Sequence, residues 1–171
     1  MSALTALVAI GAIVFLIGQQ VVGTAVSGKR LVVLPAILTV VGIVELGGSS
    51  HVNAMDVVML ALSAGTAIAI GLGLGAMTRL ERRDGHLWAQ LPKRGLWLWV
   101  GLFVSRALMA GVANVSGAHL AAGTAAILLT LGLNRAAQSL VIVPRAISAG
   151  IPFAPEKDGR VFGASWFSQS A

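Results

Sequence analysis

Five long apolar stretches, separated by short polar segments, constrain this chain more than any other feature of its sequence. A helix needs about 20 apolar residues to cross the ~30 Å of hydrocarbon in a bilayer. The stretches are Leu4–Val26, Leu31–Leu46, Met55–Met77, Leu96–Val115 and His119 to about Val143. The alternation of a membrane β-barrel is missing from them. We therefore predict an all-α integral membrane bundle of five transmembrane helices over residues 1–146, followed by a cytoplasmic tail over residues 147–171.

The composition supports the membrane class and removes several functions. Hydrophobic residues make up 57% of the chain and charged residues 11%, with a mean hydropathy of +0.90. Globular domains carry roughly 25% charged residues, so a soluble domain, a disordered tail and a nucleic-acid-binding domain are excluded. Cysteine is absent, which excludes disulfides, thiolate metal sites and thiol redox catalysis. We expect no metal, no other cofactor and no nucleic-acid partner.

The net charge is +6, and most of the basic residues lie in the connections between the apolar stretches and in the tail. Their distribution predicts the orientation of the chain. Membrane proteins concentrate Lys and Arg in their cytoplasmic loops. Connections 47–54 and 116–118 carry neither residue, whereas the first and third connections and the tail are basic. Their basic residues are Lys29, Arg30, Arg79, Arg82, Arg83, Lys93, Arg94, Arg145, Lys157 and Arg160. This alternation predicts an outside N-terminus, a cytoplasmic C-terminus and a multi-pass protein of the cytoplasmic membrane, with its basic loops on anionic membrane lipid.

The longest connection, residues 78–95, is predicted to form a charged hairpin at the cytoplasmic surface. Asp84-Gly85 is a turn signal within it. Trp88, Trp97 and Trp99 stand where aromatic residues anchor a protein at the membrane interface. After Pro144, we expect the chain to be either a loose end or a flap over the cytoplasmic face.

Gly71 and Gly75 form a small-xxx-small pair in the third apolar stretch. Such a pair lets two helix backbones approach closely. The second helix belongs either to the same bundle or, in the sharper interpretation, to another copy of the chain. The sequence therefore leaves open a homodimer through Gly71 and Gly75.

Ionisable residues within the apolar stretches are candidates for function, because burying a charge in a membrane is costly. With a rise of ~1.5 Å per residue, Glu45 lies about 21 Å beyond Leu31 and Arg106 about 15 Å beyond Leu96. Asp56 opens the third stretch from the outer side. We predict that Arg106 pairs with Glu45 or Asp56, either as a structural ion pair or as part of a reactive site. His51, Asn53, Asn114 and His119 are expected near the same outer third of the bundle.

An acid in an apolar cavity suggests proton-transfer chemistry. Desolvation favours the protonated form of a carboxyl group, which can then act as a general acid. Asp56 and Glu45 are the predicted catalytic acids, and Arg106, His51, His119 and Asn114 the predicted supporting groups. Aromatic faces can stabilise a developing cation. The sequence offers Trp97, Trp99, Phe103 and Phe15 as substrate-lining aromatics, although lipid anchoring and core packing would explain them equally.

Two local segments resemble a family of small membrane proteins. The segment Gly18-Gln19-Gln20-Val21-Val22-Gly23, the following Gly28-Lys29-Arg30-Leu31-Val32-Val33-Leu34-Pro35, and Arg82-Arg83-Asp84-Gly85-His86-Leu87-Trp88 resemble CcdC-like proteins of actinobacteria. That family is mostly of unknown function. In size and composition the chain also resembles the drimentine-type membrane terpene cyclases, which implies protonation-initiated cyclisation of a polyprenyl chain.

Three functions remain open from the sequence. The first is a membrane enzyme acting on an isoprenoid or lipid-like hydrophobic substrate, such as a proton-initiated terpene cyclase. The second is a non-enzymatic assembly factor or subunit of a complex. The third is a small proton-coupled transporter, which the odd number of spans disfavours because transporters often contain duplicated halves. A roomy apolar cavity that reaches Glu45 or Asp56 would favour the enzyme, and a filled core would favour the subunit.

Overall fold

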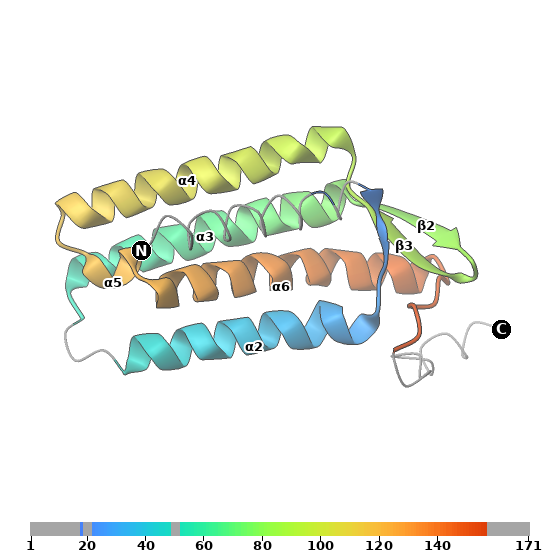
Figure 1. Ribbon diagram of the computed structural model, residues 1–171, viewed down its shortest axis with the longest axis horizontal. Helices are drawn as coiled ribbons and strands as arrows, with labels where there is room; N and C mark the ends of the chain where they lie inside the picture. The colour runs from blue at the N-terminus through green and yellow to red at the C-terminus, as the bar shows by residue number, and fades with distance from the viewer. Residues whose placement is uncertain (1–17, 19–21, 49–51, 157–171) are drawn as a thin grey trace.

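The computed structural model describes residues 18, 22–48 and 52–156, most of which are helical (Figure 1). Four helices are long and apolar enough to cross a membrane: α2 (Gly28–Gly47), α3 (Ala54–Met77), α4 (Leu96–Val115) and α6 (Thr124–Ser148). They confirm the last four predicted spans. The predicted first span, Leu4–Val26, lies mostly outside the described residues. Its end is wrong, because Thr24–Ala25 forms a short strand, β1.

The start of α2 shows how a proline is accommodated inside a membrane helix. The helix begins at Gly28, three residues before the predicted start, and continues through Pro35. Proline lacks the N–H that would bond the carbonyl four residues earlier, here that of Leu31. The Ser139 hydroxyl on α6 donates to this carbonyl instead. A side chain of the neighbouring helix thus replaces the missing backbone hydrogen bond.

The last predicted span, His119 to Val143, is interrupted near its beginning. His119–Ala122 forms the one-turn helix α5, and Gly123 is extended, with φ −76° and ψ 171°. Helix α6 then continues through Pro144 to Ser148, past the predicted end. A proline within a helix removes one hydrogen bond, so the helix can continue when its flanking turns are held by packing.

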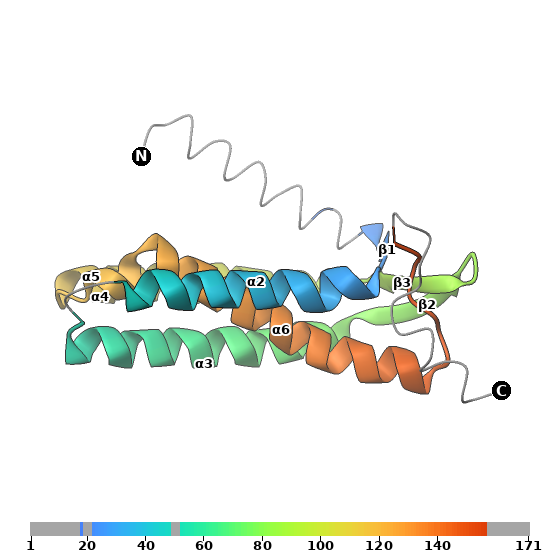
Figure 2. The ribbon, with the colours of Figure 1, turned by 90° about the horizontal axis from the view of Figure 1, so that it is seen from below.

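Helix α6 packs against both α2 and α3, while α4 packs against α3 (Figures 1 and 2). Glycines allow these close approaches. A Cβ on Gly132 of α6 would lie 2.6 Å from the Thr39 backbone nitrogen on α2. A Cβ on Gly71 would collide with the Asn134 carbonyl oxygen, and one on Gly75 would lie 2.9 Å from the Gln138 carbonyl oxygen. The α3 glycine pair therefore packs inside one chain, and a homodimer through it would require this contact to open.

One end of the bundle carries a small antiparallel sheet, which the all-α prediction did not include. Strands β2 (Arg79–Arg83) and β3 (His86–Gln90) form the predicted hairpin, and β1 adds to β3 in the order β1-β3-β2. The Asp84-Gly85 turn is confirmed, with φ values of 52° and 78°. The hairpin leads through the 3-10 turn η1 (Lys93–Gly95) into α4. Pairing between β1 and β3 joins residues more than 60 positions apart, so local sequence patterns did not reveal it.

Residues 151–156 return across this sheet and support the flap interpretation of the tail. The Leu87 N–H donates to the Pro152 carbonyl at 2.7 Å, and the Ala154 N–H donates to the Val26 carbonyl at 2.9 Å. Phe153 is fully buried in a cluster with Leu87. The part of the tail that the structure describes is therefore a fixed strap rather than a loose end.

Candidate functional site

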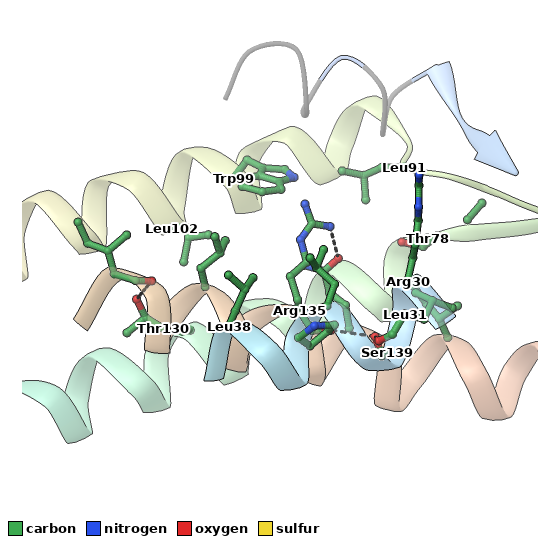
Figure 3. Close-up of a pocket in the computed structure, with 18 of the residues that line it drawn as sticks. Arg30, Leu31, Leu38, Thr78, Leu91, Trp99, Leu102, Thr130, Arg135 and Ser139 are labelled. Carbon is green, nitrogen blue, oxygen red and sulfur yellow. Dashed lines mark hydrogen bonds between the residues drawn. The ribbon is translucent and has the colours of Figure 1, made fainter. Parts of the chain in front are cut away.

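A cavity of about 500 Å³ opens within the bundle between α2 and α4, with α3 and α6 forming its other walls (Figure 3). Helices α2 and α4 lie at opposite edges of the bundle in Figure 1, so their facing sides line this space instead of each other. Most of its surface is apolar. The principal apolar side chains are Leu34, Leu38, Leu102, Phe103, Met109 and Leu131. Small-molecule sites typically have volumes of ~300–1,000 Å³.

Two of the four predicted lining aromatics do line the cavity. Trp99 and Phe103 lie one turn apart on α4, and their rings stack with centroids 5.8 Å apart. Trp97 points outward and is 76% exposed, as expected of a lipid or interface anchor. Phe15 lies outside the described residues. Trp97 and Trp99 have different surroundings because residues two positions apart face different sides of a helix.

The predicted acid Asp56 is buried in the first turn of α3, at the end of the bundle opposite the sheet, with 3% of its surface exposed. Its Oδ1 accepts hydrogen bonds from the N–H groups of Leu120 and Ala121 at 3.0 and 3.2 Å. Its Oδ2 accepts the N–H of Asn53 at 3.2 Å, which caps the start of α3. Asp56 thus holds α5 against the first turn of α3. It is not among the residues that line the cavity.

The other acidic and polar candidates are less closely defined. Glu45 is exposed near the C-terminal end of α2, which lies away from the sheet, and does not line the cavity. His51 lies outside the described residues, as do the side chains of Asn114 and His119. Within the described part of the chain, no three His, Cys, Asp or Glu residues are grouped as metal ligands.

The predicted ion pair between Arg106 and Glu45 or Asp56 is not formed. Between described residues, the one ion pair is Arg83–Glu81, at 3.6 Å on the hairpin surface. Arg106 Nη2 instead donates to the Ala121 carbonyl at 3.3 Å, while Nη1 is buried without a hydrogen-bond partner. Asp56 accepts hydrogen bonds from backbone N–H groups of α5, and Arg106 donates one to a backbone carbonyl of α5. The prediction favoured a carboxylate as the partner of Arg106, whereas the structure supplies a backbone carbonyl.

Arg135 on α6 is the cavity residue whose role the sequence analysis missed. Its Nη1 donates to Gln138 Oε1 at 3.4 Å, and its guanidinium carbon lies 5.6 Å from the centre of the Trp99 ring (Figure 3). An ionisable residue near the middle of a predicted span is a recognised signal of function. Thr130, Asn134, Arg135, Gln138 and Ser139 recur at three- and four-residue spacing, so they share one side of α6, and this spacing is the signal that could have identified Arg135.

No family model, curated protein or solved structure matches this chain. The resemblances to CcdC-like proteins and to drimentine-type cyclases therefore stay predictions. The proposal for function therefore rests on the geometry of the cavity.

Proposed function

We propose that this chain is an integral membrane protein that takes an isoprenoid or other lipid-like molecule from the bilayer into the cavity between α2 and α4. The observation that carries the proposal is the cavity itself, with its volume of about 500 Å³ and its largely apolar lining along four helices. A subunit whose only role is assembly would have no need of such a space. The cavity therefore favours a site for a hydrophobic molecule over a purely structural role.

Three hydroxyl groups of the lining are bonded within their own helices, which strengthens this preference for a hydrophobic occupant. Thr66 and Thr130 donate to carbonyls four residues earlier in their own helices, at 2.8 and 2.7 Å. Ser105 donates to the Leu102 carbonyl at 2.9 Å. Hydroxyls bonded in this way place less demand on a ligand for hydrogen bonds. The walls near them can therefore accept an apolar chain.

The chemical half of the sequence-based hypothesis, protonation by Asp56 or Glu45, stays a prediction. Neither carboxyl group lines the cavity, and the oxygens of Asp56 already accept three backbone hydrogen bonds. A general acid must lie within hydrogen-bond reach of the atom that it protonates. We therefore propose binding of the lipid-like molecule without assigning the proton donor to either residue.

We also propose that the sheet end of the bundle faces the cytoplasm. Lys29, Arg79, Lys93 and Arg145 lie at or beside the helix ends that meet the sheet, whereas the opposite connections carry no Lys or Arg. This distribution fits the preference of basic residues for the cytoplasmic side. Reporter fusions after Ser50 and after Ala171 test it. A periplasm-specific reporter should be active at Ser50 only, and its activity at Ala171 would contradict the orientation.

Two leucine-to-tryptophan variants on α4 test the binding proposal. Leu102 lines the cavity, whereas Leu108 is 65% exposed on the outer surface of the bundle. Purified protein in nanodiscs of neutral phosphatidylcholine would be titrated with farnesol, a 15-carbon isoprenoid, and bound ligand counted by native mass spectrometry. We expect saturable binding that Leu102→Trp reduces at least tenfold by filling the cavity. Leu108→Trp should bind farnesol as the unchanged protein does. Equal binding by both variants, or no binding by the unchanged protein, would refute the proposal.

A further inference from the structure

The charged residues of the cavity are all cationic. Arg30, Arg106 and Arg135 line it, and no Asp or Glu of the described residues does. An unbalanced positive charge within a membrane span is costly unless an anion or a set of carbonyls accompanies it. The positive charge of these arginines, which no carboxylate of the described residues balances in the cavity, therefore points to an anionic ligand.

Both arginines deep in the bundle, Arg106 and Arg135, keep hydrogen-bond donors that the described residues do not use. A guanidinium has five N–H donors. Within the described part of the chain, Arg135 makes one hydrogen bond, the long one to Gln138, and no carboxylate lies within 4 Å of it. Arg106 makes one hydrogen bond to the Ala121 carbonyl on α5, which holds it toward the end of the bundle away from the sheet. Arg135 is the deep cation with unused donors that lies beside Trp99, in the part of the cavity that Arg30 also lines.

A buried chain of amides holds Arg135 in place. The Asn134 side-chain N–H donates to the Ala67 carbonyl on α3 at 2.8 Å. Gln138 Nε2 donates to Asn134 Oδ1 at 2.7 Å, which leaves Gln138 Oε1 to accept from Arg135. Asn134 is fully buried and Gln138 is 6% exposed. Groups fixed by packing and by a further layer of hydrogen bonds bind ligands with less loss of conformational freedom.

The Arg135 guanidinium extends toward the first turn of α4, which begins at the sheet end of the bundle (Figure 3). Arg135 lies about 16 Å along α6 from Thr124, yet its guanidinium reaches the ring of Trp99, which is within the first turn of α4. Figure 3 shows Arg30, near the start of α2, extending toward the same side of the cavity as Arg135. Two cations thus lie toward one end, and apolar side chains such as Leu38, Leu102 and Met109 lie beyond them.

We propose that the lipid-like ligand carries a phosphate ester as its head group, and that Arg135 binds this phosphate while the apolar chain extends away from Arg30 along the cavity. This inference rests on the proposed function. Phosphate fits the site because a guanidinium offers it two parallel N–H donors, whereas an ammonium or alcohol head group would leave Arg135 without a counter-charge. The phosphate belongs to a lipid rather than to a free anion, because most of the surface of the lining is apolar.

The test compares two probes with the same apolar chain, farnesyl monophosphate and farnesol. Their dissociation constants would be measured on the full chain in nanodiscs of neutral phosphatidylcholine. We expect the phosphate to bind about 10- to 100-fold more tightly, as a desolvated charge-assisted contact would give. Inorganic phosphate at millimolar concentration should leave farnesol binding unchanged and displace little farnesyl monophosphate. Strong displacement would indicate a site for free anions and would overturn the lipid phosphate.

Three variants assign the effect to Arg135. Arg135→Gln should abolish the preference for phosphate while farnesol still binds, which also shows that the variant is folded. Arg135→Lys should keep part of the preference, because it retains the charge but loses the two-donor geometry. Arg82→Gln, on the exposed hairpin, removes the same charge outside the cavity and should keep the full preference.

The outcomes separate this inference from the proposed function. Equal affinity for the two probes, or a preference that survives in Arg135→Gln, would overturn the phosphate site and leave the lipid cavity in place. Failure of the unchanged protein to bind either probe would overturn both.

Discussion

The end of the bundle opposite the sheet and the wall of the cavity differ in how their charged groups are satisfied. Asp56, at the end opposite the sheet, accepts hydrogen bonds from three backbone N–H groups, of α5 and of the start of α3. Arg135 on the cavity wall has a single long hydrogen bond and an aromatic ring beside it. A charge satisfied by backbone groups serves the fold, whereas a charge with unused donors in a cavity can serve a ligand. Burial alone does not distinguish the two.

Removing Asp56 should have the largest effect on stability and the smallest on ligand choice. Asp56→Ala leaves three N–H groups without an acceptor, and we expect a loss of about 3 kcal/mol in the free energy of unfolding. Glu81→Ala removes a carboxylate of the exposed pair with Arg83 and should cost under about 1 kcal/mol. Unfolding in mild detergent, followed by circular dichroism, measures both. The preference for farnesyl monophosphate should persist in Asp56→Ala.

The milder change Asp56→Asn could reverse this comparison. It keeps Oδ1, the acceptor of two of the N–H bonds, and removes the acidic proton. If Asp56→Asn kept its stability but lost all conversion of a linear farnesyl-bearing substrate to a cyclic isomer, Asp56 would be the acid of a cyclase. Asp56 would then serve the chemistry of the protein rather than its fold.

Gly71→Ala should have the next largest effect, because it disturbs the support beneath Arg135. The added methyl group would collide with the Asn134 carbonyl oxygen and lie 2.9 Å from the Ala137 Cβ. Overpacking of this kind costs about 1–3 kcal/mol. We also expect a reduced preference for phosphate, because Asn134 begins the amide chain that orients Arg135. Gly65→Ala on the same helix meets nothing within 4 Å and should be neutral or slightly stabilising. Equal stability of the two variants would show that α3 and α6 can separate freely.

Arg145→Gln should have a smaller effect than Asp56→Ala or Gly71→Ala, although it removes three hydrogen bonds to backbone carbonyls. Arg145 Nη1 donates to the carbonyls of Gly75, Ala76 and Thr78 at 2.8, 3.2 and 3.1 Å, at the end of α3. The residue is exposed, so water can replace part of what is lost, and we expect a cost of roughly 1 kcal/mol. Ligand discrimination should not change. If Arg145→Gln lowered the free energy of unfolding as much as Asp56→Ala, the two ends of the bundle would depend equally on these two side chains.

Much of the framework was predictable from the sequence because it depends on local patterns. Apolar length identified four helices that the structure contains, with α4 matched at both ends. Asp84-Gly85 identified the hairpin turn, since both residues adopt positive φ with little strain. The break at Gly123 and the pairing of β1 with β3 were not predicted. They depend on where distant segments meet rather than on the residues around them.

The candidate site was only partly predictable, for a related reason. The structure places Trp99, Phe103 and Arg106, which the sequence analysis named, along the cavity, but Arg135 was given no role there. In α2 and α3 apolar side chains occur on every face, so the sequence does not mark the side of these helices that turns toward a cavity. Asp56 and Arg106 were expected to pair, whereas backbone groups of α5 are the partners of both.

The sequence by itself determined that the chain is a membrane protein with helices of spanning length and with its basic residues at alternate connections. Hydrophobic length and the cost of burying charge act on each segment separately, so they can be read from each segment. Only the tertiary structure decided which charges are satisfied and which remain available. That outcome depends on backbone groups of α5 reaching Asp56 and Arg106, and on α2 and α4 standing apart around a cavity that Arg135 faces.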